Sequence, residues 1–232
     1  MNSIPSGWVL RPLADGAFCV PTALAAAANA AWFDPQRADA KPVAEGGRQA
    51  AWFVAGEHGP AVLRHYRRGG LRARLGPDGY AWLGQARVRA FAEVRVLAHL
   101  QAAGVLVPQP LGAAYWRLGL FYRTAILVAR IDGAQALASR LDQADPQAVA
   151  TAIRAMHRAG VWHADLNAYN ILFDSQGRVW LIDFDRARLG VVSEAQQYKN
   201  LLRLRRSLVK VAGERGAQWW DVLDTVWRTL PV

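Results

Sequence analysis

Apolar residues in the first half of the chain gather in short runs separated by turn sequences. Residues 51–54 and 61–66 are two such runs, with a Gly-Pro turn between them, and residues 122–128 form a third. Runs of this length that are bounded by glycine and proline are typical of β-strands. The first half of the chain is therefore predicted to form a β-sheet.

In other stretches, apolar residues recur at the spacing of an α-helix. In residues 86–100 they fall on one helical face, and Gly104 then ends the segment. Further helices are predicted over residues 20–33, 146–159 and 197–211. A last helix is indicated by apolar residues near the end of the chain, namely Trp219, Leu223, Val226, Trp227 and Leu230. This recurrence is typical of core packing, while tryptophan beside basic residues also suits a membrane surface, and both interpretations stay open.

Residues 161–185 combine a polar loop with a predicted hairpin. The loop sequence His-Ala-Asp-Leu-Asn-Ala-Tyr-Asn directly follows two apolar residues. Apolar runs at residues 171–173 and 179–182 then flank a turn that ends in Gly177, which predicts strand, turn and strand. If the two strands pair, the chain returns to the start of the hairpin.

A returning hairpin brings three polar side chains together. Asp183 would lie near Asn170 and Asp165, although the two aspartates are well separated in the sequence. Phosphoryl transfer requires a carboxylate that accepts the proton of the attacking hydroxyl, and hard oxygen ligands for Mg²⁺. The three residues fit this set of requirements. The alternative is that they only cap turns and end a strand.

This stretch resembles the catalytic and metal-binding loops of the protein-kinase-like superfamily. The resemblance rests on the loop at residues 163–170 followed by Ile-Asp-Phe at residues 182–184. It implies that Asp165 is the catalytic base. It also implies that Asn170 and Asp183 bind Mg²⁺, and that all three residues belong to the ATP-binding site.

The resemblance further implies an α+β, protein-kinase-like bilobal fold. Residues 1–128 would form a small, mainly antiparallel β lobe, with a sheet that covers the nucleotide and a helix of the αC type. Residues 129–232 would form a truncated, mainly helical lobe with the catalytic and metal-binding loops and the terminal helices. We place the hinge between the lobes at residues 129–133, where adenine would lie against the backbone.

Four residues of the first lobe are predicted to hold the nucleotide. Gly46 and Gly47 precede the strand at residues 51–54, and only glycine lets backbone amides approach phosphate oxygens so closely. Arg64 stands where the superfamily strand Val-Ala-Ile-Lys has its lysine, so the charge is kept while the geometry changes. Glu93, in the middle of a predicted helix, would pair with Arg64. The alternatives are an ordinary hairpin turn, a solvent-facing arginine and a solvated glutamate.

Three departures from the protein-kinase pattern argue against a peptide substrate. Ala164 replaces the arginine that pairs with an activation-loop phosphate, Asp185 replaces the glycine of Asp-Phe-Gly, and no Ala-Pro-Glu follows. The segment after Asp185 is too short for the platform on which protein kinases bind peptides. A non-catalytic pseudokinase is a further alternative, and the joint presence of Asp165, Asn170 and Asp183 argues against it.

Length and composition favour one globular domain or one bilobal unit. The chain has 232 residues, of which 53% are hydrophobic, so it can bury a sizeable core. A single cysteine, Cys19, excludes an internal disulfide and fits a reducing compartment. The apolar run at residues 20–33 is too short to span a bilayer, and Asp15 before it argues against a signal peptide. We expect a cytoplasmic location and no transmembrane helix.

The charge balance predicts an anionic partner. The formal net charge is +10, and only three of the 28 basic residues are lysines. Four arginines and two glycines at residues 67–74 suggest an anion site, with a solvated loop as the alternative. Together with Arg203, Arg206 and Lys210, these arginines would draw the protein to anionic lipid. The arginine excess alone is also compatible with a biased base composition.

Over nearly its whole length the chain resembles the small lipopolysaccharide kinases of Gram-negative bacteria. The resemblance rests on residues 63–70, Trp82-Leu83-Gly84, Gly119-Leu120-Phe121-Tyr122-Arg123 and residues 183–188. It implies ATP-dependent phosphorylation of the 4-hydroxyl of a 3-deoxy-D-manno-octulosonic acid (Kdo) sugar on a lipid A precursor. A peripheral protein at the cytoplasmic face of the inner membrane would carry out this reaction.

The expected partners are accordingly the Kdo-bearing lipid and the anionic membrane surface. We expect no nucleic acid and no obligate protein partner. A lipopolysaccharide heptose kinase, or an antibiotic or choline phosphotransferase, would use the same catalytic residues with another acceptor pocket, and it remains the alternative.

Overall fold

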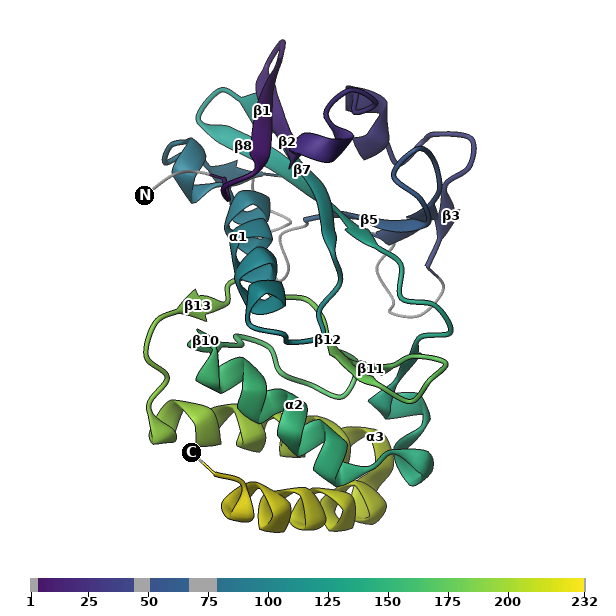
Figure 1. Cartoon of the computed structure of the whole chain (residues 1–232), viewed down its shortest axis with the longest axis vertical. Coiled ribbons are helices and arrows are strands. Elements are labelled where there is room, and N and C mark those ends of the chain that lie inside the picture. The colour runs from purple at the N-terminus through teal and green to yellow at the C-terminus, as the bar shows by residue number, and fades with distance from the viewer. Residues whose placement is uncertain (1–3, 44–50, 67–78, 232) are drawn as a thin grey trace. The chain divides into compact units, whose positions relative to one another are not determined.

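A computed structural model describes residues 4–43, 51–66 and 79–231 of the chain (Figure 1). Two compact units can be distinguished. One consists of Met1–Ala98 with Gln109–Arg130, and the other of His99–Pro108 with Ile131–Val232. Gly46, Gly47 and the arginine-rich loop at residues 67–74 lie outside the described residues. Their predicted roles, and the lobe boundary after residue 128, stay predictions.

In the first unit, the described residues form one antiparallel sheet of eight strands. The strand order is β1-β2-β7-β8-β5-β4-β3, and β6 also pairs with β8. The strands are β1 Trp8–Leu13, β2 Gly16–Pro21, β3 Lys41–Pro42, β4 Ala51–Val54, β5 Ala61–His65, β6 Tyr80–Ala81, β7 Pro110–Leu118 and β8 Phe121–Ala129. The three strands predicted from apolar runs are confirmed as β4, β5 and β8. The hairpin β1-β2 and the long strand β7 were not anticipated.

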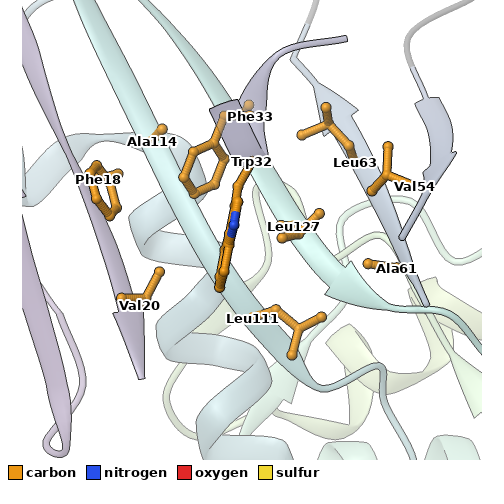
Figure 2. Close-up of a cluster of buried hydrophobic side chains, with 11 residues drawn as sticks. Phe18, Val20, Trp32, Phe33, Val54, Ala61, Leu63, Leu111, Ala114 and Leu127 are labelled. Atoms are coloured by element: carbon orange, nitrogen blue, oxygen red, sulfur yellow. The ribbon is translucent and has the colours of Figure 1, made fainter. Parts of the chain in front are cut away.

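One face of this sheet packs on the rings of Trp32 and Phe33. Both rings are buried, and Figure 2 shows them among side chains of neighbouring strands, including Phe18, Leu63 and Leu127. The rings come from a 3-10 helix, η2 Ala30–Phe33, which follows another short 3-10 helix, η1 Thr22–Leu24.

The α-helix predicted over residues 20–33 is therefore wrong. Cys19 and Val20 belong to β2, where Cys19 pairs with Ala113 of β7. The sheet satisfies the backbone there, and Pro21 then ends the strand. Asn29 begins η2 by accepting a hydrogen bond from the Ala31 amide. Sheet pairing, Pro21 and Asn29 together outweigh the helical propensity of the alanines.

The predicted amphipathic helix at residues 86–100 is confirmed as α1 Arg89–Ala102, which begins after a 3-10 turn, η4 Gln85–Arg87. Phe91 of α1 packs edge-on against Tyr115 of β7 at 5.6 Å between ring centroids. Because Ala114 belongs to the cluster around Trp32 and side chains alternate along a strand, Tyr115 and α1 cover the opposite face of the sheet.

The second unit is mainly helical. Its helices are α2 Pro146–Arg158 and α3 Glu194–Thr229, preceded by the 3-10 turns η5 Leu137–Ser139 and η6 Leu141–Gln143. Short strands are β9 Gln135–Ala136, β10 Val161–Trp162, β11 Ile171–Phe173, β12 Val179–Leu181 and β13 Arg188–Leu189. Both long helices begin at capping residues: Asp145 accepts from two amides of α2, and Ser193 forms a capping box with Gln196 in α3.

The helix α3 consists of two arms that meet at Gly213. This glycine has φ 57° and ψ −129°, a conformation that breaks the helix and that favours glycine. The second arm then packs back on the first (Figure 1), and the Trp220 indole donates a hydrogen bond to the Leu201 carbonyl at 3.1 Å. Leu223 and Trp227 are buried, as expected for core packing. None of the helices in the described part of the chain is long and apolar enough to cross a membrane.

Candidate active site

The polar loop predicted to carry the chemistry joins β10 to β11. The hairpin that follows is confirmed: β11 and β12 pair antiparallel, with Ile171 opposite Leu181. The Ile182 amide donates to the Asn170 carbonyl at 3.0 Å, which extends the pairing to the end of the loop. The hairpin thus brings Asp183 back beside Asn170, as the alternation of apolar strand and turn predicted.

The turn of the hairpin is held by a buried carboxylate. Asp174 accepts hydrogen bonds from the Gln176 and Arg178 amides, from the Arg178 guanidinium and from the Trp180 indole. Burial alone would raise the pKa of Asp174, but these bonds outweigh it and lower the pKa to about 2. Asp174 therefore connects the turn to the start of β12 through hydrogen bonds.

His163 is fully buried beneath the loop and is held in one tautomer. Its Nδ1 accepts the Asp165 amide at 3.0 Å, so the proton is on Nε2, which donates to the Ile182 carbonyl at 3.0 Å. Burial lowers the pKa of His163, against the opposing effects of the Ile182 hydrogen bond and the nearby Asp183 and Asp165 charges. The neutral ring therefore ties the loop that carries Asp165 to the segment that carries Asp183.

Asn200, on the first arm of α3, fixes the start of the loop. Its amide nitrogen donates to the His163 carbonyl at 2.6 Å, and its Oδ1 accepts from the His163 amide at 3.3 Å. The same Oδ1 lies 2.9 Å from Nε2 of His157 in α2. Burial lowers the pKa of His157 to about 4, so this ring is neutral and donates to Asn200. The buried polar network joins both helices to the loop.

The carboxylate of Asp165 is paired with Arg203 of α3. Its Oδ1 accepts from Nε of Arg203 at 2.7 Å, from Nη2 of the same guanidinium, and from the Asn167 amide at 3.1 Å. No hydrogen bond from a described residue ends on Oδ2. Burial would raise the pKa of Asp165, but the hydrogen bonds from Asn167 and Arg203 and the Arg203 charge lower it. Asp165 is thus an oriented, ionised carboxylate with one oxygen unoccupied by the part of the protein that is described.

Asn170 and Asp183 carry the side-chain oxygen atoms of the predicted metal site. The Asn170 side-chain nitrogen donates to the Asp165 carbonyl at 2.9 Å, which orients the amide, and none of the described residues donates to its Oδ1. Asp183 has φ 62°, a left-handed conformation that is uncommon for a residue with a side chain. Such strained backbone is concentrated at functional sites.

The donor set formed by Asn170 and Asp183 fits Mg²⁺. An amide oxygen and a carboxylate are hard ligands of the kind that magnesium takes when substrate phosphates complete its coordination. Within the described residues, no group of three or more His, Cys, Asp or Glu side chains is arranged to hold a metal ion. A site that uses one Asp, one Asn and phosphate oxygens needs no such group.

In the first unit, Arg64 and Glu93 form an ion pair, as predicted. Nη2 of Arg64 donates to both carboxylate oxygens of Glu93, at 2.6 and 2.5 Å, and the Tyr66 hydroxyl donates to the same carboxylate. Glu93 is buried, whereas the Arg64 side chain remains one-quarter exposed. The guanidinium also lies over the Tyr66 ring, at 4.9 Å from its centroid. Glu93 and Tyr66 therefore hold a partly accessible cation at a fixed place on β5.

Two residues of this arrangement were missed by sequence reasoning. Asn200 was not singled out, although an asparagine between apolar helix positions is a signal for a buried polar contact. Arg203 was assigned to lipid attraction, and the structure instead pairs its guanidinium with Asp165. The ion pair could not be foreseen because the two residues are 38 positions apart in the sequence.

The second unit has a paired carboxylate on a polar loop and a hairpin that returns an aspartate to it, and the first unit has a strand arginine paired with a helix glutamate. Each is a feature that the kinase-like class of phosphotransferases leads one to expect. The fold agrees: it is α+β, with one small antiparallel β lobe and one mainly helical, truncated lobe. The model of the Lipopolysaccharide kinase (Kdo/WaaP) family matches residues 33–225, and the chain belongs to this family.

Similar proteins of several bacteria carry one description. The chain is 48% identical over 197 residues to the 3-deoxy-D-manno-octulosonic acid kinase of Stenotrophomonas maltophilia (strain R551-3). The matched region covers 82% of this chain and 79% of that protein. For the protein of that description in Xanthomonas campestris pv. campestris (strain B100), identity is 47% over 194 residues, with 81% and 78% covered. For that of Xylella fastidiosa (strain M12), identity is 45% over 193 residues, with 82% and 75% covered. The predicted family is confirmed.

Proposed function

We propose that the chain transfers the γ-phosphoryl group of ATP to the 4-hydroxyl of a Kdo sugar on a lipid A precursor, in lipopolysaccharide core biosynthesis. The observation that carries this proposal is the identity of nearly one-half to Kdo kinases over four-fifths of the chain. The ionised Asp165 carboxylate supplies the group that such a transfer requires.

In the proposed reaction, Asp165 accepts the proton of the sugar hydroxyl. The hydroxyl oxygen forms a bond to the γ-phosphorus, the bond from that phosphorus to the bridging oxygen breaks, and ADP leaves with the electron pair. Because Oδ1 of Asp165 is held by Arg203 and Asn167, Oδ2 is the oxygen that receives the proton. A base fixed in this way contributes through orientation as much as through basicity.

Arg203 is proposed as the residue that positions this base. Its two nitrogens grip one carboxylate oxygen and leave the other directed away from the ion pair. The positive charge keeps Asp165 ionised before the sugar arrives, because it favours the charged form of the carboxylate. This arginine comes from α3 and not from the loop that carries Asp165.

Asn170 and Asp183 would hold Mg²⁺. Magnesium held by these two residues would supply positive charge that offsets the negative charge of the transferred group. His163 keeps the Asp183 segment and the Asp165 loop in register through its two ring nitrogens. The position of Asp183 relative to the Asp165 loop therefore depends on a buried neutral histidine.

The first unit is proposed to hold the ATP phosphates through Arg64. Glu93 accepts from Nη2 of its guanidinium, the Tyr66 ring lies against the guanidinium face, and the side chain is one-quarter exposed. A guanidinium that is held in this way carries a permanent charge toward phosphate oxygens. Gly46 and Gly47 keep their proposed role as backbone donors to the same phosphates.

The acceptor in this proposal is carried by a lipid, so we place the protein at the cytoplasmic face of the inner membrane as a peripheral protein. The net charge of +10 supports attraction to an anionic surface. We propose no nucleic acid and no obligate protein partner.

The proposal is tested by incubating the purified chain with ATP and Mg²⁺ and each of two acceptors. One is a Kdo-bearing lipid A precursor, and the other is a core lipid whose terminal sugar is heptose. We expect mass spectrometry to show one added phosphoryl group on the Kdo-bearing lipid only, and NMR to locate it on the 4-oxygen. Phosphorylation of the heptose-bearing lipid alone would favour the heptose kinase alternative, and a phosphate elsewhere on Kdo would refute the proposed position.

A further inference from the structure

Two sequence strings that carry the family resemblance lie side by side in the first unit. Trp82-Leu83-Gly84 follows β6, and Gly119 and Leu120 form the turn between β7 and β8. β6 pairs with the start of β8, and the Trp82 amide donates to the Leu120 carbonyl at 2.9 Å. None of the catalytic roles proposed above uses either string.

Three leucine side chains at this end of the sheet are exposed. Leu120 is 82% exposed, Leu83 64% and Leu118 46%. Gly119 has φ 61°, the left-handed conformation that the tight turn between β7 and β8 requires and that favours glycine. None of the three leucines is among the buried core residues, and their exposed apolar surface has an energetic cost in water that a partner surface would remove.

An arginine and a tryptophan lie beside the turn between β7 and β8. The Arg117 guanidinium lies over the Trp82 ring at 4.8 Å from its centroid and donates to the Gly119 carbonyl at 3.3 Å. Arg87 and Arg123 are exposed as well. Residues 94–131 contain no acidic residue, and neither do residues 79–92. One acidic residue, Asp15, is joined to this region by its backbone carbonyl, which accepts from the Arg117 amide.

We propose that this tip patch, formed by Trp82, Leu83, Arg117, Leu118 and Leu120, docks the protein on an anionic lipid bilayer. The leucines enter the boundary of the acyl layer, and the Arg117 guanidinium meets the lipid phosphates. Tryptophan with an arginine stacked on it suits the headgroup level, where one side is apolar and the other is wet. Exposed apolar side chains beside basic residues are typical of surfaces that bind membrane interfaces. A protein partner would not require basic residues there.

This inference rests on the proposed function, because a lipid-borne acceptor is the reason for the protein to visit a membrane. Docking through the leucines also differs from membrane binding through charge attraction alone. Charge attraction fades as salt screens it, whereas the insertion of leucines persists. The tip patch therefore predicts a salt-resistant component of membrane binding.

The test measures co-sedimentation of the full chain with vesicles of phosphatidylglycerol in phosphatidylcholine, and with vesicles of phosphatidylcholine alone. We expect Leu118→Ser with Leu120→Ser to weaken binding to the anionic vesicles by at least about 10-fold, as expected for two partly inserted leucines, and to abolish binding at high salt. The control is Val191→Ser with Val222→Ser, whose side chains are 99% and 53% exposed in the second unit. It should bind like the wild type.

Replacing Arg117 and Arg123 tests the proposed attraction between arginine side chains and lipid phosphates. Arg117→Gln with Arg123→Gln should weaken binding to the anionic vesicles by roughly 10-fold or more and leave the weak binding to neutral vesicles unchanged. Unchanged binding of the leucine variant would overturn the docking proposal. So would a dimer of the wild type that the leucine variant loses while vesicle binding stays the same.

Two acceptors separate this inference from the proposed function. With a deacylated, soluble Kdo acceptor the leucine variant should turn over at the wild-type rate, whereas with the lipid acceptor in vesicles its rate should fall by at least about 10-fold. A fall of the same size on the soluble acceptor would overturn docking in favour of an acceptor-binding role for the tip. If wild type and variant phosphorylate neither acceptor but differ in vesicle binding, the proposed function fails while the docking surface stands.

Discussion

Arg203 is the residue whose substitution distinguishes a positioned base from an exposed carboxylate. Arg203→Ala should lower kcat by roughly 10- to 100-fold with little change in the KM for ATP, because Asp165 loses the partner that orients it. Arg203→Lys should recover part of the rate, since it restores the charge without the second nitrogen. Steady-state kinetics of both variants give the comparison.

The control for Arg203 is Arg206→Ala, which removes an exposed arginine three residues further along α3. It should retain the wild-type kcat. A faster Arg203→Ala enzyme would contradict the positioning role, since it would mean that the ion pair holds the base back.

Asn170 and Asp183 are tested through the magnesium dependence of nucleotide binding. Asp183→Asn should weaken ATP binding in the presence of Mg²⁺ and leave the weaker metal-free binding nearly unchanged, because a neutral amide is a poorer ligand for a hard dication. Asn170→Ala should act in the same direction. Calorimetric titration with and without Mg²⁺ measures both, and Asp221→Asn on the exposed side of α3 controls for the loss of one charge. An unchanged magnesium dependence in both variants would remove them as ligands.

At the residue scale, local sequence was sufficient for the hairpin and the loop. His163, Asp165 and Asn170 lie within a few positions of one another, and the two apolar runs that follow dictate where Asp183 returns. Asn200 and Arg203 could not be placed in this way. Their contacts depend on how α3 packs, which is a tertiary property that no local period encodes.

Among the elements, α3 is the one whose shape depends most on single glycines. A β-carbon on Gly216 would lie 2.2 Å from the Leu208 carbonyl oxygen, where one arm meets the other. Gly216→Ala should therefore destabilise the fold by about 1–3 kcal/mol, through overpacking against backbone that cannot move aside. Gly213→Ala should cost a similar amount for another reason, because its φ of 57° is strained for a residue with a β-carbon.

Urea denaturation of these variants gives the free energy of unfolding. Glu214→Ala, an exposed change between the two glycines, should stay within about 0.5 kcal/mol of the wild type. If Gly216→Ala were as stable as this control, the close packing of the two arms would be refuted.

The elements also show where periodicity is a sufficient guide and where it is not. The helix α1 and the strands β4, β5 and β8 follow from apolar spacing, because each has one buried face. The segment at residues 20–33 is mostly alanine and other apolar residues without a clear polar face, so spacing could not separate helix from strand. There, sheet pairing through Cys19 and the cap at Asn29 decided the structure.

For the whole molecule, buried neutral histidines predict a loss of stability in mild acid. Burial lowers the pKa of His157 to about 4, whereas an unfolded histidine titrates near about 6.5. The unfolded chain thus binds a proton that the folded chain does not, and stability should fall as the pH drops from about 6.5 toward 4, by up to about 1.4 kcal/mol per pH unit for this group. Burial also lowers the pKa of His163, which adds to the effect in the same direction.

Unfolding free energies between about pH 7 and pH 4.5 measure this slope. His157→Gln keeps an amide that can donate to Asn200 and removes the titrating ring. The slope of the unfolding free energy against pH should therefore decrease by the equivalent of about one bound proton. The low pKa of Asp174 acts below this window, because its stabilisation is complete above the pKa of an unfolded carboxyl and is lost only as the pH falls toward about 2. A wild type whose stability does not change from pH 7 to pH 4.5 would contradict the neutral network.

The central claim is that this molecule transfers phosphate to a Kdo-bearing lipid with Asp165 as the base. The most direct measurement follows that transfer by mass spectrometry for the wild type and Asp165→Asn, beside nucleotide affinity on the same preparations. We predict a turnover about 10²- to 10⁴-fold lower in the variant, the usual contribution of a positioned base, with nucleotide affinity nearly unchanged. Wild-type turnover by Asp165→Asn, or no transfer to the Kdo-bearing lipid by the wild type, would contradict the account.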